Sequence, residues 1–407
     1  MAVLLIGTLD TKGVECQYLR DRLRGAGVDA LVLDAGVLGP PAFAADVPRE
    51  ELFAAAGESL DALRTAGDRG RAVEAAARGA AAVARDLHGR GRVDGVLGLG
   101  GSAGTVIGTA AMRALPFGVP KLMVSTVASG QVRPYVGRSD VCMMYSVVDV
   151  SGLNRVSRRV LANAAAAMAG MVRGAGAATE SGEDRPLIAA TMFGVTTPCV
   201  DAARARVERA GYETLVFHAT GVGGRTMEAF ITEGQIAGVL DLTTTELADE
   251  LVGGVLGAGR DRLTAAALRG VPQVISLGAL DMVNFGPPDT VPERFAGRLF
   301  HRHNASVTLM RTTPEENDLL GKEIAHKASA ARGPTAVLAP LRGVSALDRE
   351  GGPFWAPAAD AALFQSLRNW MSPDVALVEL DLHVNDPAFA EAAAGTLLRF
   401  LGHSVSV

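Results

Sequence analysis

Residues 2–36, AVLLIGTLDTKGVECQYLRDRLRGAGVDALVLDAG, contain the pattern that decides the fold class. The run from Ala2 to Ile6 is short, apolar and rich in branched side chains, as in a buried strand. Residues 13–25 then carry apolar side chains at helical spacing, and residues 30–33 form a second apolar run. Strand, loop, helix and strand in this order predict a parallel sheet covered by helices.

The same pattern recurs in residues 185–221, RPLIAATMFGVTTPCVDAARARVERAGYETLVFHATG. Residues 93–108 also correspond in kind with 236–251, and residues 118–130 with 270–281. We therefore predict an α/β protein with two doubly wound, Rossmann-like parallel-sheet subdomains that derive from a duplicated unit. The stretch 174–184 is rich in Gly, Ala, Ser and Glu, so we place a linker at residues 176–185, between domains 1–175 and 186–407.

The composition narrows the classes of partner. The chain has 407 residues, of which 48% are hydrophobic, and a formal net charge of -5. An acidic protein has no general attraction to nucleic acid or to an anionic membrane, so we expect neither as a partner. The three cysteines lack CxxC spacing, and no apolar run is long enough to span a bilayer. We expect a soluble, cytoplasmic protein.

The segment GLGGSAGT, from Gly98 to Thr105, follows a predicted strand and opens a predicted helix. Ligands of doubly wound sheets bind at the carboxyl ends of strands, where glycines let the backbone approach an anion and helix amides donate to it. The segment therefore predicts a phosphate site that comprises Gly100, Gly101, Ser102, Gly104 and Thr105. The alternative is a tight turn in which the glycines only allow close packing of helix on sheet.

The first turn, GTLDTKG, is expected at the same edge of the sheet and contributes Thr8, Asp10, Thr11 and Lys12. Lys12 is suited to neutralise phosphate charge, and Asp10 to hold Mg²⁺ through water. The alternative is that Asp10 or Thr11 caps the following helix.

Two further strand ends extend the predicted nucleotide site. Asp34 and Gly36 end the second strand, where a ribose hydroxyl is often bound. Thr126 and Ser129, in the segment STVASG, follow another strand and add small hydroxyl side chains.

The second domain offers a set of polar strand-end groups that suit a small anionic substrate. His301 and His303 alternate on an extended segment, but no HExxH or carboxylate spacing accompanies them, so we predict no metal site. The candidate catalytic residues are Asp241, His301 and Arg311. The candidate substrate-binding residues are Gly194, His218, Gly221, Gly223, Gly224, Thr243, Thr244, Glu246, His303 and Asn304.

Taken together, these motifs resemble the ATP-binding family named after the amino-terminal domain of the tomato mosaic virus resistance protein. The resemblance covers nearly the whole chain and is carried by TLDTKG, GLGGSAGT, GVPKLMVSTVASG, SVVDVSGLNRVSRRVLANAA, TGVGGRTME, LDLTTTELADE, HNASVTLMRTTPEE and VNDPAFA. It implies two α/β subdomains, nucleotide binding and a homodimer. Relatives often carry a second, barrel-type domain, which here would be a separate protein.

One residue departs from the family pattern. Ala103 stands where the family more often has glycine, and a positive φ at this position would weaken nucleotide binding.

These features predict an ATP-dependent enzyme that activates a small carboxylate-type metabolite by phosphoryl or acyl transfer, with ATP and Mg²⁺ as cofactors. The alternative is a nucleotide-binding protein that acts by partner association without turnover. Dinucleotide-dependent redox chemistry ranks third, because the first turn lacks the GxGxxG fingerprint.

Overall fold

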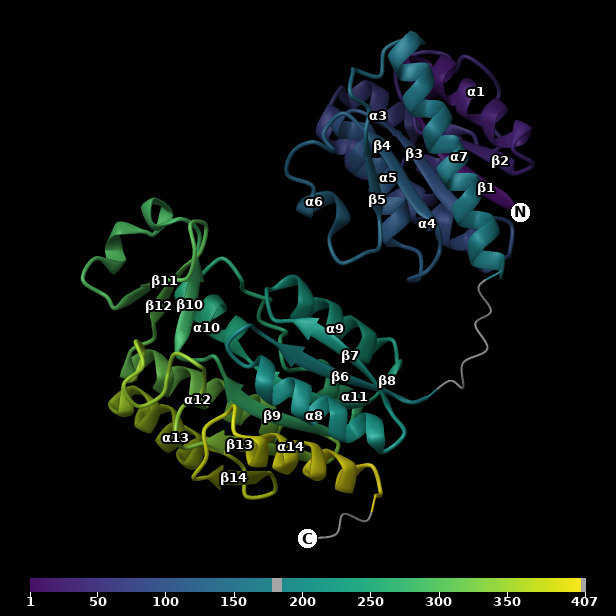
Figure 1. The fold of residues 1–407 in the computed structure, drawn as a ribbon. Helices are drawn as coiled ribbons and strands as arrows, with labels where there is room; N and C mark the ends of the chain where they lie inside the picture. The colour runs from purple at the N-terminus through teal and green to yellow at the C-terminus, as the bar shows by residue number, and fades with distance from the viewer. Residues whose placement is uncertain (178–184, 404–407) are drawn as a thin grey trace. The chain divides into compact units, whose positions relative to one another are not determined.

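The computed structural model describes residues 1–177 and 185–403. The chain divides into two compact units, Met1–Gly182 and Glu183–Val407 (Figure 1). The predicted linker at residues 176–185 lies largely outside the described residues. Each unit is described by itself below.

The amino-terminal unit is built on one parallel sheet with the strand order β2-β1-β3-β4-β5. Leu4 of β1 pairs with Leu31 of β2 on one side and with Val96 of β3 on the other, so apolar side chains fill both faces. The strands are β1 (Ala2–Gly7), β2 (Asp29–Asp34), β3 (Gly95–Gly100), β4 (Lys121–Ser125) and β5 (Cys142–Tyr145).

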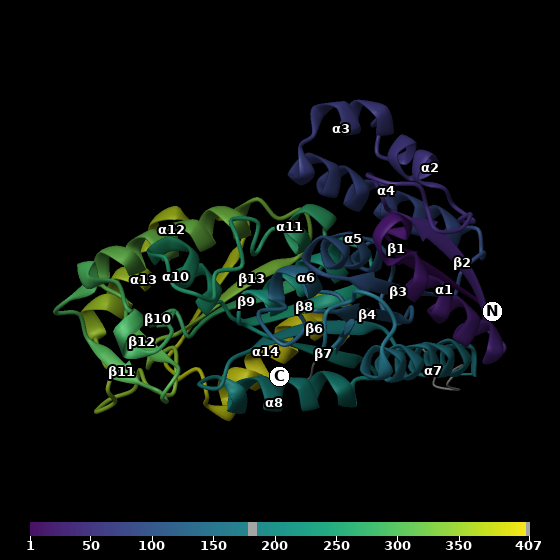
Figure 2. The ribbon, with the colours of Figure 1, turned by 90° about the horizontal axis from the view of Figure 1, so that it is seen from above.

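Helices cover both faces of this sheet, as a parallel sheet requires (Figure 2). One face packs against α1 (Leu9–Gly25) and α7 (Arg155–Ala177). The opposite face packs against α2 (Arg49–Ala55), α3 (Leu60–Ala66), α4 (Arg69–Gly89) and α5 (Ser102–Arg113). The short helix α6 (Arg133–Val136) lies between β4 and β5 in the chain.

The carboxy-terminal unit has a sheet with the order β14-β13-β9-β8-β6-β7. The strands are β6 (Leu187–Met192), β7 (Glu213–His218), β8 (Ile236–Thr243), β9 (Gln273–Gly278), β13 (Thr335–Pro340) and β14 (Ala376–Leu380), all parallel to their neighbours. In the opposite direction this order begins β7-β6-β8-β9-β13, which matches the order β2-β1-β3-β4-β5 of the amino-terminal sheet. Strand β8 thus corresponds to β3, and β6 to β1. The predicted fold class of two Rossmann-like parallel sheets is confirmed.

Helices also cover both faces of the second sheet. One face packs against α8 (Thr197–Arg209) and α14 (Pro387–Phe400). The other packs against α9 (Val222–Thr232), α10 (Thr245–Val252), α11 (Ala265–Arg269), α12 (Pro314–Ser329) and α13 (Pro357–Trp370).

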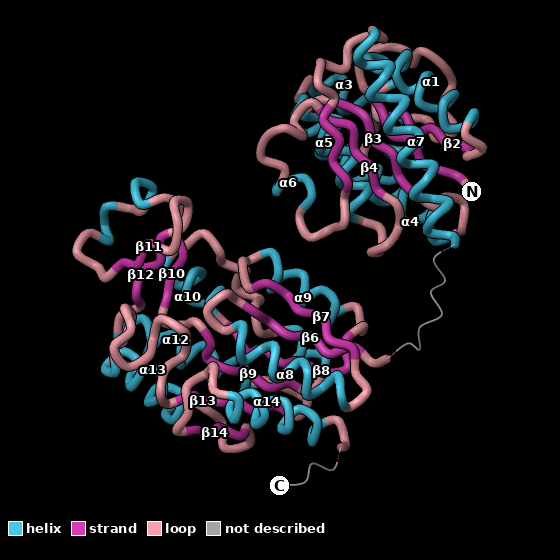
Figure 3. The backbone as a smooth tube through the Cα atoms, viewed as in Figure 1, coloured by secondary structure: helices cyan, strands magenta, loops and turns pink. Residues whose placement is uncertain are grey.

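A small antiparallel sheet is inserted between β9 and α12, and the sequence did not predict it. Its strands β10 (Met282–Phe285), β11 (Phe300–Arg302) and β12 (Thr308–Arg311) have the order β10-β12-β11 (Figure 3). Two 3-10 turns, η1 (Pro288–Thr290) and η2 (Glu293–Phe295), connect β10 to β11. Over the described residues, no helix has the length and apolar character needed to cross a membrane.

Candidate nucleotide site

A pocket of about 520 Å³ lies in the amino-terminal unit at the carboxyl ends of β1, β2 and β3. Nine predicted cofactor-binding residues line it: Thr8, Asp10, Thr11, Lys12, Gly36, Gly100, Gly101, Ser102 and Gly104. The loops that carry them are far apart in the sequence, and the parallel order of the strands brings them to one edge.

The amino-terminal end of α5 forms one end of the pocket. Gly101 is its N-cap and provides no side-chain cap, and the first turn contains no acidic residue. The amides at the start of a helix have no partner within the helix, so this end attracts an anion. The backbone of α5 passes close to Gly100, and an added Cβ at this position would lie only 2.8 Å from the Cα atom of Gly104. A glycine is therefore needed here. Ala103 lies within the first turn without a positive φ, so the weakening expected from its replacement of glycine does not apply.

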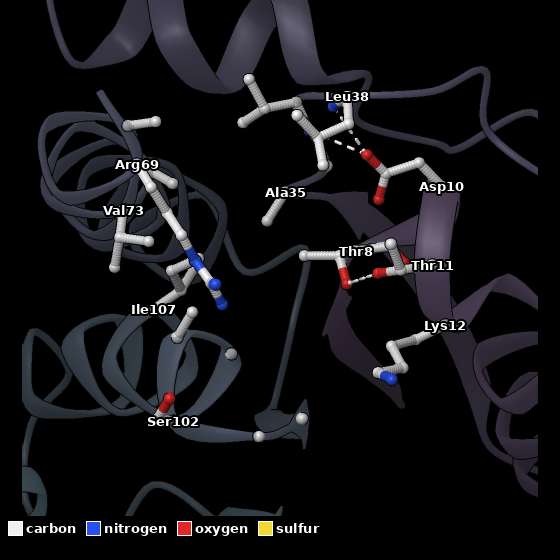
Figure 4. Close-up of a pocket in the computed structure, with 18 of the residues that line it drawn as sticks. Thr8, Asp10, Thr11, Lys12, Ala35, Leu38, Arg69, Val73, Ser102 and Ile107 are labelled. Carbon is white, nitrogen blue, oxygen red and sulfur yellow. Dashed lines mark hydrogen bonds between the residues drawn. The ribbon is translucent and has the colours of Figure 1, made fainter. Parts of the chain in front are cut away.

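Two cationic side chains reach into the pocket from opposite sides (Figure 4). Lys12 extends from α1, where its φ of -125° and ψ of 19° break the regular helix after the first turn. Arg69 extends from the first position of α4. Together with the start of α5, these two groups place positive charge at the pocket that is suited to phosphate.

The predicted Mg²⁺ ligand Asp10 is already used within the protein. Its Oδ2 atom accepts hydrogen bonds from the amides of Val37 (3.0 Å), Leu38 (2.8 Å) and Gly39 (3.3 Å). Its side chain is only 3% exposed. Gly36 leaves room for this carboxyl group, because an added Cβ would lie 2.6 Å from the Cγ atom of Asp10. Asp10 therefore holds the loop after β2 in place, a role different from the one predicted.

Asp34, the predicted ribose ligand, is buried beneath the pocket and has no place in its lining. Its Oδ1 accepts from the amides of Leu9 (2.9 Å) and Gly36 (2.8 Å). Its Oδ2 accepts from the Nε atom of Arg49 at 2.8 Å, and the Nη2 atom of the same guanidinium lies in an ion-pair contact at 2.7 Å. By receiving the Leu9 amide, Asp34 caps α1, which is why this helix begins before the predicted residue 13.

Three other predicted nucleotide ligands lie outside the pocket lining. The Thr105 hydroxyl is buried, donates to the carbonyl of Gly101 (2.7 Å) and lies 2.7 Å from the Ser125 hydroxyl. Thr126 is half-buried and donates its amide to Gly100 (3.3 Å), whereas Ser129 is exposed on the loop that follows.

Much of the pocket wall was missed by the sequence analysis. It is apolar and comes mainly from α3, α4 and the loop after β2. Leu38, which lines the pocket at its edge, is 84% exposed. The missed lining residues are Ala35, Val37, Leu38, Leu63, Arg64, Gly67, Asp68, Arg69, Ala72, Val73, Ala76, Ala103, Ile107 and Asp149.

In the carboxy-terminal unit, the candidate catalytic residue Asp241 lies in a buried ion-pair network. Its carboxylate receives the guanidinium of Arg262 at 2.5 and 2.7 Å and the Thr191 hydroxyl at 2.8 Å. Glu246, also fully buried, accepts from the Nε atom of Arg262 at 2.7 Å. Thr243 and Thr244 are also buried. These four predicted residues therefore lie in the interior of the unit, where their side chains contact other protein groups and not a substrate.

The predicted anion cradle at the start of α9 is occupied by the protein's own carboxylate. Glu246 Oε1 accepts from the amides of Gly221 (2.5 Å) and Gly224 (3.1 Å). An added Cβ on Gly223 would lie 1.9 Å from the carbonyl oxygen of His218, so this glycine permits close packing. His218 is exposed and stacks on the Phe193 ring at 5.4 Å, beside the exposed Gly194.

The remaining predicted residues belong to the antiparallel insertion. His301 is half-buried on β11, and His303 and Asn304 are exposed in the hairpin before β12. Arg311 is 4% exposed and donates to Asp360 (2.7 Å) and to the carbonyl of Phe354 (2.8 Å). The antiparallel insertion that carries His301 and Arg311 packs on the segments that follow β6, β9 and β13, and Arg311 is used there in buried contacts within the protein.

Arg311 lies in a buried cluster with three carboxyl groups, Asp281, Asp348 and Asp360. Burial, and secondarily the charge of Asp348, raises the pKa of Asp281 to about 7. The same two causes raise the pKa of Asp360 to about 7. A proton held in this cluster balances the excess of negative charge.

Comparison with known proteins identifies the family of the chain. A UPF0261 protein of Clostridium tetani is 49% identical over 400 residues, which cover 98% of each chain. The ToMV resistance protein Tm-1(GCR237) of Solanum lycopersicum is 41% identical over 419 residues, which cover 97% of this chain and 55% of the tomato protein. The chain thus spans about half of that relative. The predicted resemblance to the tomato protein is confirmed, whereas ATP binding stays a prediction.

Among solved structures, a glycosyltransferase of Streptomyces sp. SF2575 complexed with thymidine diphosphate is 13% identical, with a TM-score of 0.18 over 98% of this chain and 96% of its own. A UDP-N-acetylglucosamine 2-epimerase of Rickettsia bellii is 9% identical, with a TM-score of 0.22 over 98% of this chain and 95% of its own. Likeness at this level carries no functional argument.

Two family models match the chain, one for each unit. Residues 1–177 match the amino-terminal domain of the uncharacterised protein family UPF0261, and residues 185–401 match its carboxy-terminal domain. Because the two models cover nearly the whole chain, it belongs to the uncharacterised protein family UPF0261.

Proposed function

We propose that the amino-terminal unit binds ATP in the pocket at the carboxyl ends of β1, β2 and β3. The observation that carries the proposal is the uncapped start of α5, which faces Lys12 and Arg69 across a pocket of about 520 Å³. Helix amides and flexible cations together suit a chain of phosphates. The volume is in the range of pockets that bind small molecules and cofactors.

The apolar wall supports a nucleotide over inorganic polyphosphate. Leu38, Leu63 and Val73 line the pocket and provide an apolar surface on which a base can lie, and Lys12 and Arg69 provide the cations for the phosphates. A ligand of this site therefore has one flat apolar part and one strongly anionic part. ATP has both.

Calorimetric titration tests this proposal with ATP, adenosine and inorganic tripolyphosphate as three separate ligands. We expect ATP to bind more tightly than either fragment, because each fragment fills only one part of the pocket. Val73→Trp, which fills the apolar part, should abolish ATP binding. The control Glu74→Gln changes an exposed neighbour outside the lining and should bind as wild type. Equal ATP affinity in Val73→Trp would reject the site.

The bound ATP is either hydrolysed during a reaction or only held. ATP-dependent activation of a small carboxylic acid predicts phosphate release that rises when the correct acid is added. A partner protein without turnover predicts tight ATP binding and no release with any acid. The buried ion pairs of Asp241 and Arg311 favour the second outcome, since neither residue is available to a substrate in this conformation.

A further inference from the structure

The loop between β5 and α7 carries a carboxylate, Asp149, into the lining of the pocket. The turn before it is strained. Val147 is β-branched yet has a φ of 65°, a conformation that such residues rarely adopt. The Val148 amide donates to the carbonyl of Ser146 (2.8 Å), and the buried Ser146 hydroxyl donates to the carbonyl of Val148 (2.7 Å). The backbone is thus held in the conformation that precedes Asp149.

The far end of the loop is tied to the helix that carries Lys12. The Gly152 amide donates to Glu15 of α1 at 2.5 Å, and Glu15 is 2% exposed. Val150, next to Asp149, is buried in the core between α1, α7 and the sheet. These anchors keep the Asp149 carboxylate at the pocket.

Asp149 is exposed and has one oxygen available to a ligand. Its Oδ1 accepts from the amide of Val150 at 2.8 Å. Among residues 1–177 and 185–403, no group donates to its Oδ2. The other two carboxylates of the lining also accept backbone amides through one oxygen each: Asp10 receives three amides of the loop after β2 and is only 3% exposed, and Asp68 caps α4.

A free carboxylate in a pocket lined for phosphate has a clear cost, because it repels the phosphates. A divalent cation between the two removes the repulsion. Mg²⁺ in nucleotide sites is commonly held by one or two carboxylates together with substrate phosphates and water. We propose that Asp149, in place of Asp10, is the carboxylate that holds the Mg²⁺ of bound ATP; this inference rests on the proposed nucleotide site.

The test measures ATP affinity by calorimetry with Mg²⁺ and with EDTA. For the wild type we expect Mg²⁺ to tighten ATP binding by about tenfold or more. Asp149→Asn should remove that difference, and in EDTA it should bind ATP more tightly than the wild type, because the repulsion is gone. Asparagine can still accept the Val150 amide, so the turn is preserved. Asp68→Asn, the matched control, should keep the Mg²⁺ dependence.

Binding of Mn²⁺ and ATP, followed by electron paramagnetic resonance, provides a second measurement that does not depend on turnover. The signal of protein-bound Mn²⁺ should disappear in Asp149→Asn and persist in Asp68→Asn. An unchanged Mg²⁺ dependence in Asp149→Asn would overturn the inference and leave the ATP site standing, as would equal wild-type affinity with Mg²⁺ and with EDTA. Absence of wild-type ATP binding under both conditions would reject the proposed function itself.

Discussion

The two units share a strand order but differ at the carboxyl ends of their strands. In the amino-terminal unit, the loop after β3 contains glycines and Ser102, and the start of α5 opens into a pocket. In the carboxy-terminal unit, the helix that follows the corresponding strand β8 is α10, and its first turn contains Glu246, which accepts the amides at the start of α9 and pairs with Arg262. The fold determines where a ligand can bind, and the side chains of the loops determine whether the space is open.

The difference has an electrostatic basis. Helix amides attract negative charge in both units. Glu246 satisfies the amides at the start of α9 internally, and the buried Arg262 neutralises Glu246 together with Asp241. At the start of α5, no acidic residue does so. The start of α5 is therefore open to an external anion, whereas the start of α9 is filled by a carboxylate of the protein itself.

The largest effect is expected from removing Arg262, the cation that neutralises Asp241 and Glu246 in the carboxy-terminal unit. Arg262→Met leaves Asp241 and Glu246 as buried charges without a cation beside them, which should destabilise the carboxy-terminal unit by about 3–5 kcal/mol. Urea unfolding followed by circular dichroism measures this change. Arg342→Met, which breaks an exposed pair with Asp381, serves as the control and should leave the transition where it is. If Arg262→Met shifts the urea transition only slightly, the ion-pair network of Arg262, Asp241 and Glu246 does not contribute much to the stability of the carboxy-terminal unit.

A second change places a carboxylate at the start of α5, as Glu246 already does at the start of α9. Ser102→Glu adds a carboxylate to the first turn of α5, where it competes with phosphate for the amides and repels it. We expect ATP affinity to fall by about a hundredfold or more, since like charges in contact cost several kcal/mol. Thermal stability should not fall, because an acidic residue favours a helix start. The uncharged Ser102→Gln is the control, and equal losses in both variants would assign the effect to size.

Removing either Lys12 or Arg69, the two cations that reach into the pocket, should have a more moderate effect on ATP affinity. Lys12→Met and Arg69→Met should each weaken ATP binding by about tenfold, because each loses one charge-assisted contact with phosphate. Calorimetric titration at two salt concentrations measures the loss and its salt dependence. Arg64→Met is the control, because Arg64 lines the pocket but donates its Nε to the carbonyl of Val37 at 2.6 Å. A similar loss in Arg64→Met would show that general charge, and not position, attracts the ligand.

A further expected effect is a pH dependence of the stability of the carboxy-terminal unit, which is spread over several pH units. The pKa values of Asp281 and Asp360 are raised to about 7 in the folded protein, so the folded state keeps protons that the unfolded chain releases near pH 4. Stability from this cluster is complete below about pH 4 and declines as pH rises through 7. The decline per proton cannot exceed about 1.4 kcal/mol per pH unit.

Urea unfolding between pH 5 and 8 measures this dependence. Asp281→Asn should flatten the profile, because it removes one of the carboxyl groups that retain a proton. A wild-type profile that is flat, or that rises with pH through this range, would contradict the protonated cluster.

The two parallel-sheet units were predictable because their sequence signals are local. The run from Ala2 to Ile6 and the helix after it repeat as residues 187–209, and each repeat can be recognised without knowing its partners. The glycines at 100, 101 and 104 and the residues Thr8 to Lys12 were placed at one edge for the same reason. By contrast, Leu38 and Arg69 carry no local signal, because they reach the pocket only through the packing of α4 and the loop after β2.

By itself, the sequence determined the two parallel-sheet units and the edge at which one of them places its glycine-rich loop, since both follow from hydrophobic periodicity and glycine position. Only the tertiary structure decided which carboxylates are free. Asp10, Asp34, Asp241 and Glu246 look as available in the sequence as Asp149 does, but backbone amides and the guanidinium groups of Arg49 and Arg262 occupy them. A buried charge must find such a partner, and the partner comes from another part of the chain.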